Sequence, residues 1–84
     1  MLFHVTVDHS PETCPVVTNT PENRITAEGV AKAGVKLVLA LGGRAQHCTI
    51  YMVEADDINK LYDFLNPALS WAKCDIMPVR ELQD

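Results

Sequence analysis

The sequence has little of several features that would point directly to a function. Only 6% of its 84 residues are aromatic, only seven are lysine or arginine, and its three cysteines form no Cys-x-x-Cys pair. The basic residues stand singly in a chain of net charge −4, which argues against nucleic-acid and anionic-membrane partners. Because phosphate-binding loops, dinucleotide fingerprints and Gly-x-Ser-x-Gly motifs are also missing, no cofactor is expected.

Long apolar segments are missing as well. The longest mainly apolar run, Val35 to Gly43, contains Lys36 and is far too short to span a bilayer. Met1 is followed by no basic stretch and no small-residue cleavage site, so a secretory signal is not expected. Three cysteines would leave one thiol unpaired in a secreted protein, and we therefore expect a cytoplasmic protein.

The length of the chain predicts a single domain, residues 1–84, with one small core. A domain of this size buries only about 60 to 65% of the surface that its unfolded chain exposes. Self-association would bury more of it, so we expect a homodimer or a higher homo-oligomer. A small-molecule site and a protein-interaction module are the classes of function that remain.

Apolar residues in the first half of the chain follow the periods of strands and of one helix. Leu2–Asp8 alternates strictly between apolar and polar residues, which predicts a strand buried on one face. Thr20 is the expected N-cap of a helix that runs to about Ala33 and ends at Gly34. Two extended segments then flank Gly42-Gly43 and predict a β-hairpin, Val35–Leu41 and His47–Glu54.

The second half predicts one more helix and one more strand. Carboxylates at positions 54 to 57 favour a helix N-terminus, and Pro67 marks a break or kink before Trp71. Lys73–Arg80 is the last strand, and Pro78 places it at a sheet edge. The order β, α, β, β, α, β predicts an α+β fold, the ferredoxin-like two-layer sandwich, with both helices on one face of the sheet. The core expected beneath them consists of Phe3, Val5, Val7, Cys48, Ile50, Met52 and Ile76.

The other face of the sheet is expected to be open and to carry the candidate site. Alternation places six polar or amphipathic side chains there: His4, Thr6, Asp8, His47, Thr49 and Tyr51. In one interpretation they line a small-molecule pocket that a second sheet closes, in which His4 and His47 transfer protons. Asp8 and Tyr51 would orient a histidine and donate a hydrogen bond, and Thr6 and Thr49 would contact the substrate. Acid/base or oxygenation chemistry on a small organic compound would suit such a pocket.

Two other interpretations stay open. The open face is either simply solvated or the interface of a non-enzymatic dimerising module. Alternatively, His9, Cys14 and His47 bind a metal, because they offer the nitrogen and sulfur ligands that zinc and copper prefer. Antiparallel pairing of the first and third strands brings His9 close to His47, but Cys14 reaches them only if its loop folds over the end of the sheet. Cys48 and Cys74 are expected to be buried small apolar residues.

Four segments of the sequence resemble a family of short uncharacterised bacterial and archaeal proteins: Met1–Pro15, Val53–Asp57, Phe64–Pro67 and Asp75–Val79. That family is similar to the dimeric α+β barrel superfamily, with one ferredoxin-like unit in each chain. The resemblance implies a dimer whose two sheets face each other around a cavity. It implies no catalytic residue, because no motif of an assigned enzyme branch is present.

Overall fold

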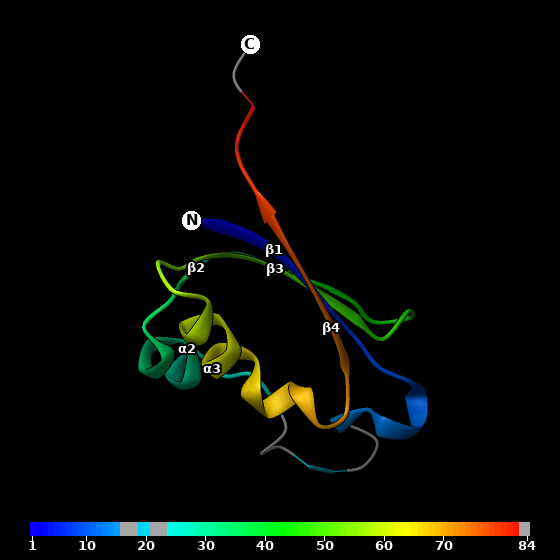
Figure 1. The fold of residues 1–84 in the computed structure, drawn as a ribbon. Helices are drawn as coiled ribbons and strands as arrows, with labels where there is room; N and C mark the ends of the chain where they lie inside the picture. The colour runs from blue at the N-terminus through cyan, green and yellow to red at the C-terminus, as the bar shows by residue number, and fades with distance from the viewer. Residues whose placement is uncertain (16–18, 21–23, 83–84) are drawn as a thin grey trace.

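The strand and helix patterns of the sequence assemble into one sheet covered on one face. The structure, a computed structural model, describes residues 1–15, 19–20 and 24–82. Neighbouring strands are antiparallel, in the order β2-β3-β1-β4, and Figure 1 shows both helices on the same side of the sheet. This is the ferredoxin-like α+β fold predicted from the sequence. Its elements are β1 (Leu2–Asp8), the 3-10 turn η1 (Pro11–Thr13), α2 (Ala27–Ala33), β2 (Lys36–Gly43), β3 (Cys48–Glu54), α3 (Ile58–Leu69) and β4 (Lys73–Val79).

The core lies between the sheet and α3. Strand β1 alternates as its sequence predicts, because its three odd-numbered apolar residues are buried while the residues between them are partly exposed. Leu61, Phe64 and Leu65 of α3 pack against them and are almost completely buried. The buried apolar set is Phe3, Val5, Val7, Val35, Val53, Ala55, Leu61, Phe64, Leu65 and Ala68.

Strand β3 faces the helices with the opposite set of residues from the predicted one. Val5 lies opposite Tyr51 in the β1–β3 register, and residues directly opposite in an antiparallel pair share a face. The helix side of β3 therefore carries Thr49, Tyr51 and Val53, and Val53 is fully buried. The prediction that Cys48, Ile50 and Met52 fill the core is wrong. Both phases of this strand contain apolar residues, so polarity alone does not distinguish its two faces.

The open face of the sheet is consequently more apolar than predicted. The register places Ile50 and Met52 beside His4 and Thr6, with Leu39 and Leu41 of β2 next to them. Leu39 and Leu41 are exposed. Met77 of β4 lies opposite His4 on the same face and is exposed as well.

Helix α2 is shorter than predicted. Its N-cap is Thr26, whose Oγ1 accepts a hydrogen bond from the N–H of Gly29 at 3.1 Å. Thr20 is therefore not the N-cap, although both threonines have the side-chain oxygen that a cap needs. The rest of the predicted first turn, residues 21–23, lies outside the described residues. The predicted end is confirmed, because Gly34 follows the helix with a left-handed φ of 76°.

The hairpin is confirmed, but its turn lies later than predicted. Gly42 and Gly43 belong to β2, and the turn comprises residues 44–47. His47 is thus the last residue of the turn, and β3 begins with Cys48. The backbone N–H of His47 donates to the carbonyl oxygen of Arg44 at 3.3 Å.

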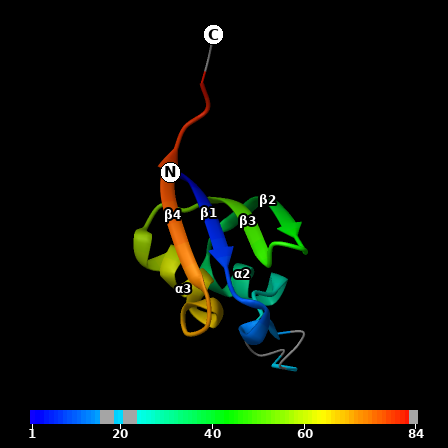
Figure 2. The same ribbon diagram turned by 90° about the vertical axis from the view of Figure 1, so that its right-hand side faces the viewer.

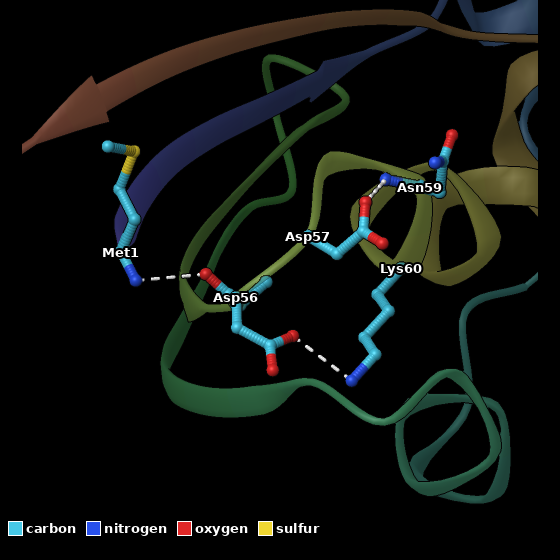
Figure 3. A network of polar contacts seen from close by, with 6 residues as sticks. Met1, Asp56, Asp57, Asn59 and Lys60 are labelled. Atoms are coloured by element: carbon cyan, nitrogen blue, oxygen red, sulfur yellow. Dashed lines mark hydrogen bonds and ion pairs between the residues drawn. The ribbon is translucent and has the colours of Figure 1, made fainter.

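Helix α3 begins where the acidic residues predict it. The N-cap Asp57 accepts a hydrogen bond from the N–H of Asn59 at 2.9 Å, and Lys60 forms an ion pair with Asp56 at 3.0 Å (Figure 3). The helix continues past Pro67 to Leu69, two residues beyond the predicted break. Strand β4 follows at the edge of the sheet opposite β2, as Pro78 predicts (Figure 2). Among the described residues, no helix has the length and apolarity needed to cross a membrane.

Candidate metal centre

The pairing of β1 with β3 brings His9 and His47 together at one end of the sheet. His9 directly follows β1 and His47 directly precedes β3, so the antiparallel ladder places them opposite each other. The N–H of His9 donates to the carbonyl oxygen of His47 at 3.1 Å, which extends the ladder by one bond. Their imidazole rings meet at 5.1 Å between centroids and at 81°.

A short turn brings Cys14 back to the two histidines. In η1 the N–H of Thr13 donates to the carbonyl oxygen of Ser10 at 3.1 Å, and the N–H of Cys14 donates to that of Pro11 at 3.4 Å. The Thr13 hydroxyl also donates to the Ser10 carbonyl oxygen at 3.2 Å. These local bonds reverse the direction of the chain after His9. The reversal brings Cys14 back to the two histidines, as a three-ligand site requires.

His9, Cys14 and His47 form a cluster, which we call the His-Cys-His cluster. One ligand atom of each residue lies within 4.8 Å of the others. Nδ1 of His47 is 3.3 Å from Nε2 of His9. Two nitrogens bound to one tetrahedral zinc ion at 2.0–2.1 Å lie about 3.3 Å apart, so this pair already has the spacing of two zinc ligands.

The surroundings of His9 favour its neutral, ligand-competent form. Burial lowers the pKa of His9, and the neighbouring His47 lowers it further, while Asp8 acts in the opposite direction. Nδ1 of His9 is buried and has no hydrogen-bond partner among the described residues. A neutral imidazole keeps a lone pair for a metal ion.

His47 holds its position in an uncommon backbone conformation. Its φ is 51°, in the left-handed region that favours glycine and asparagine, although histidine is also enriched there. Strained backbone positions are concentrated at functional sites. The turn therefore has a histidine at a position where glycine would adopt the backbone conformation at lower cost.

Trp71 forms a wall of the site. Its ring meets the ring of His9 edge to face, with 4.9 Å between centroids. The indole Nε1 donates to the carbonyl oxygen of Pro67 at 2.7 Å, which fixes the ring at the end of α3. Trp71 is the only tryptophan of the chain.

Two cavities adjoin the His-Cys-His cluster, and His9, Cys14, Arg24 and Thr49 line both of them. The helix-side cavity has a volume of about 370 Å³ and lies at the C-terminal end of α3, where Ala68 lines it. The turn-side cavity has a volume of about 550 Å³ and lies against the hairpin turn. The helix-side cavity also has Val7, Pro15, Ile25, Tyr51, Ala68 and Trp71 in its walls, and the turn-side cavity also has Gly42, Gly43, Arg44, His47 and Cys48.

The structure divides the six residues predicted to share the open face. Thr49 and Tyr51 point to the helix side, because they share a face with Val7 and Val5, and both line the helix-side cavity. His47 lies in the turn and belongs to the His-Cys-His cluster. His4, Thr6 and Asp8 remain on the open face and line neither cavity. The prediction that all six residues share one face of the sheet is therefore wrong.

Cys48 and Cys74 are less suited than Cys14 to hold a metal. The neighbouring Asp8 carboxylate raises the pKa of Cys48, and burial raises the pKa of Cys74, so both favour the neutral thiol. Neither belongs to the His-Cys-His cluster. Both are only partly buried, rather than fully buried as predicted.

Sequence reasoning missed Arg24 and Trp71 as site residues. Arg24 lies in an irregular segment before α2, where no periodicity places it. A signal for Trp71 existed, because Lys73 is the β4 partner of Asp8 in the register. The residue shortly before Lys73 is therefore close to the residue that follows Asp8, which is His9.

Comparisons with family models, with curated proteins and with solved structures found no match to this chain. The resemblance to the dimeric α+β barrel superfamily therefore stays a prediction.

Proposed function

We propose that this protein binds a transition-metal ion, zinc in the first place, through His9, Cys14 and His47. The observation that carries the proposal is the convergence of their three ligand atoms within 4.8 Å, from two segments far apart in the sequence. Two imidazoles and a thiolate are ligands that zinc prefers. With three protein ligands the ion keeps a fourth position for water or a small molecule, next to the two cavities.

The alternative for these residues is a hydrogen bond between two histidines without a metal. The distance of 3.3 Å from His47 Nδ1 to His9 Nε2 is long for that bond, since nitrogen donors usually lie about 2.9–3.0 Å from their acceptors. This long distance favours the metal.

Titration of the untagged, metal-free protein with Zn²⁺, followed by calorimetry under reducing conditions, tests the proposal. One equivalent should bind, and Co²⁺ should give the thiolate charge-transfer band of a sulfur ligand. The affinity for Zn²⁺ should fall by about 100-fold or more in each of three variants, His9→Ala, Cys14→Ser and His47→Ala. Mutating a residue that only hydrogen-bonds to a metal ligand already lowers metal affinity by about 10–100-fold. Copper suits the same ligands, so a parallel titration with Cu⁺ shows which ion binds more tightly.

Cys48→Ser is the matched control, because Cys48 lines the turn-side cavity but lies outside the His-Cys-His cluster. Its affinity for Zn²⁺ should stay within about twofold of the parent protein. If neither Zn²⁺ nor Cu⁺ binds with one-to-one stoichiometry, or if Cys48→Ser and Cys14→Ser lose affinity equally, the metal site does not exist.

We also propose that the open face of the sheet pairs with the same face of a second copy. The support is the set of apolar residues on this face, which come from β2, β3 and β4 and surround His4 of β1: Leu39, Leu41, Ile50, Met52 and Met77. Large exposed apolar patches mark interaction sites. In a symmetric dimer both copies contribute the same patch to the interface. The open face can do this because no helix covers it.

A further inference from the structure

The described residues in the walls of the two cavities beside the His-Cys-His cluster carry charge of one sign. Of the described residues that line the helix-side cavity, Arg24 is the only one with a charged side chain, and Arg24 and Arg44 are those of the turn-side cavity. Neither arginine forms an ion pair with a carboxylate in the described part of the chain. Cavities whose described walls contain cations and no carboxylate favour an anionic ligand, even in a chain of net charge −4.

The rest of the helix-side cavity is mostly apolar and held in place. Val7, Ile25 and Ala68 contribute aliphatic surface, and Tyr51 and Trp71 contribute rings. Tyr51 packs edge to face on Phe64 with 5.3 Å between centroids, and Trp71 is fixed by its hydrogen bond to Pro67. Rings that are ordered before a ligand enters lose little entropy when it binds.

We propose that the helix-side cavity binds a small monocarboxylate with an apolar body, preferably an aromatic one. The body lies against Tyr51 and Trp71, and the carboxylate lies between Arg24 and the open position of the ion. The inference therefore rests on the proposed metal site. A guanidinium matches a carboxylate with two parallel hydrogen bonds. The volume of about 370 Å³ lies in the range of small-molecule pockets.

Inorganic phosphate fits this cavity less well, although it carries the same sign of charge. It would leave the aliphatic and aromatic walls in contact with water, whereas a carboxylate on an apolar body covers them. A neutral apolar molecule would leave the Arg24 guanidinium without a partner inside the cavity. Only a ligand with both parts uses the whole lining.

Calorimetric titrations with benzoate, benzamide and acetate test the inference, each with the Zn²⁺-loaded and the metal-free protein. Benzoate should bind at least about tenfold more tightly than benzamide, which has its shape without its charge, because hydrogen bonds between charged groups contribute that much. It should exceed acetate, which lacks the ring, by a similar factor. Zn²⁺ should strengthen benzoate binding.

Two arginine variants separate recognition from general charge. Arg24→Gln should weaken benzoate binding by about tenfold or more. Arg44→Gln removes the same charge outside the helix-side cavity and should change benzoate binding by less than about twofold.

Zn²⁺ binding without benzoate binding overturns this inference and leaves the metal site intact. Benzoate binding that depends on Arg24 in a protein that binds no metal overturns the metal site and keeps the carboxylate site. Equal binding of benzoate and benzamide, or equal losses in both variants, overturns the inference.

Discussion

The ring of His9 meets the indole of Trp71 edge to face, with 4.9 Å between their centroids and 69° between their planes. A metal ion on His9 is therefore close to the only indole of the chain. Co²⁺ is paramagnetic and should quench the fluorescence of Trp71 in proportion to its occupancy. Added Zn²⁺, which does not quench, should displace Co²⁺ and restore the emission. Steady-state fluorescence measures both the quenching and the recovery.

Cys14→Ser supplies the control for this quenching. It leaves Trp71 and His9 in place but removes one ligand, so Co²⁺ should quench only at concentrations about 100-fold higher or more. Quenching that is the same in the parent protein and in Cys14→Ser would mean that Co²⁺ reaches the indole from solution rather than from the His-Cys-His cluster.

The proposed dimer places Leu39 in an interface and leaves Leu69 outside it. The two side chains are matched, because each is 48% exposed, Leu39 on β2 and Leu69 at the end of α3. Leu39→Glu would bury an unpaired carboxylate in each half of the interface and should weaken dimerisation by about 30-fold or more. Leu69→Glu adds the same charge on the helix side and should leave the dimer intact.

Light scattering coupled to gel filtration, repeated over a range of protein concentrations, gives the mass of each variant. Circular dichroism should show that both variants fold. A parent protein with the mass of a monomer at every concentration contradicts the open-face dimer. So does a dimer that Leu69→Glu disrupts and Leu39→Glu does not.

The sequence correctly predicted the features of the site that follow from the order and pairing of the strands. It did not predict which residues of β3 face the helices. The contact of His9 with His47 follows from antiparallel pairing of the first and third strands, and the structure confirms it. The sequence predicts that Cys14 reaches the two histidines only if its loop folds over the end of the sheet, and no periodicity predicts the path of that loop. In the structure the turn of residues 10–13 brings Cys14 there. Residues 48–53 contain apolar side chains at both phases, so pairing with β1, not polarity, decides that Tyr51 faces the helices.

The burial of Tyr51 has a consequence at high pH. Burial raises the pKa of Tyr51, so the folded state keeps this proton at a pH where the unfolded chain has lost it. The unfolded state then binds fewer protons than the folded state, and the free energy of unfolding decreases as the pH rises above about 10, the ordinary pKa of tyrosine. Urea unfolding at about pH 8 and about pH 11 should show this loss.

Two phenylalanine variants isolate the contribution of Tyr51. Tyr51→Phe has no proton to lose and should lose less stability between the two pH values than the parent protein. Tyr62→Phe, on the exposed side of α3, should behave like the parent protein. If Tyr51→Phe shows the same alkaline loss as the parent, Tyr51 is not buried against the helices and the register of β3 is wrong.

The positive φ of His47 can be tested apart from its imidazole. His47→Gly and His47→Ala both remove the ring and both should lose Zn²⁺ binding. They differ at the backbone, because a Cβ at a φ of 51° costs about 1–2 kcal/mol and glycine has none. In urea unfolding with a chelator present, the glycine variant should therefore be more stable than the alanine variant by about 1 kcal/mol. Equal stabilities would show that the turn relaxes out of the left-handed region, and His47 would then not be held towards His9 by its backbone.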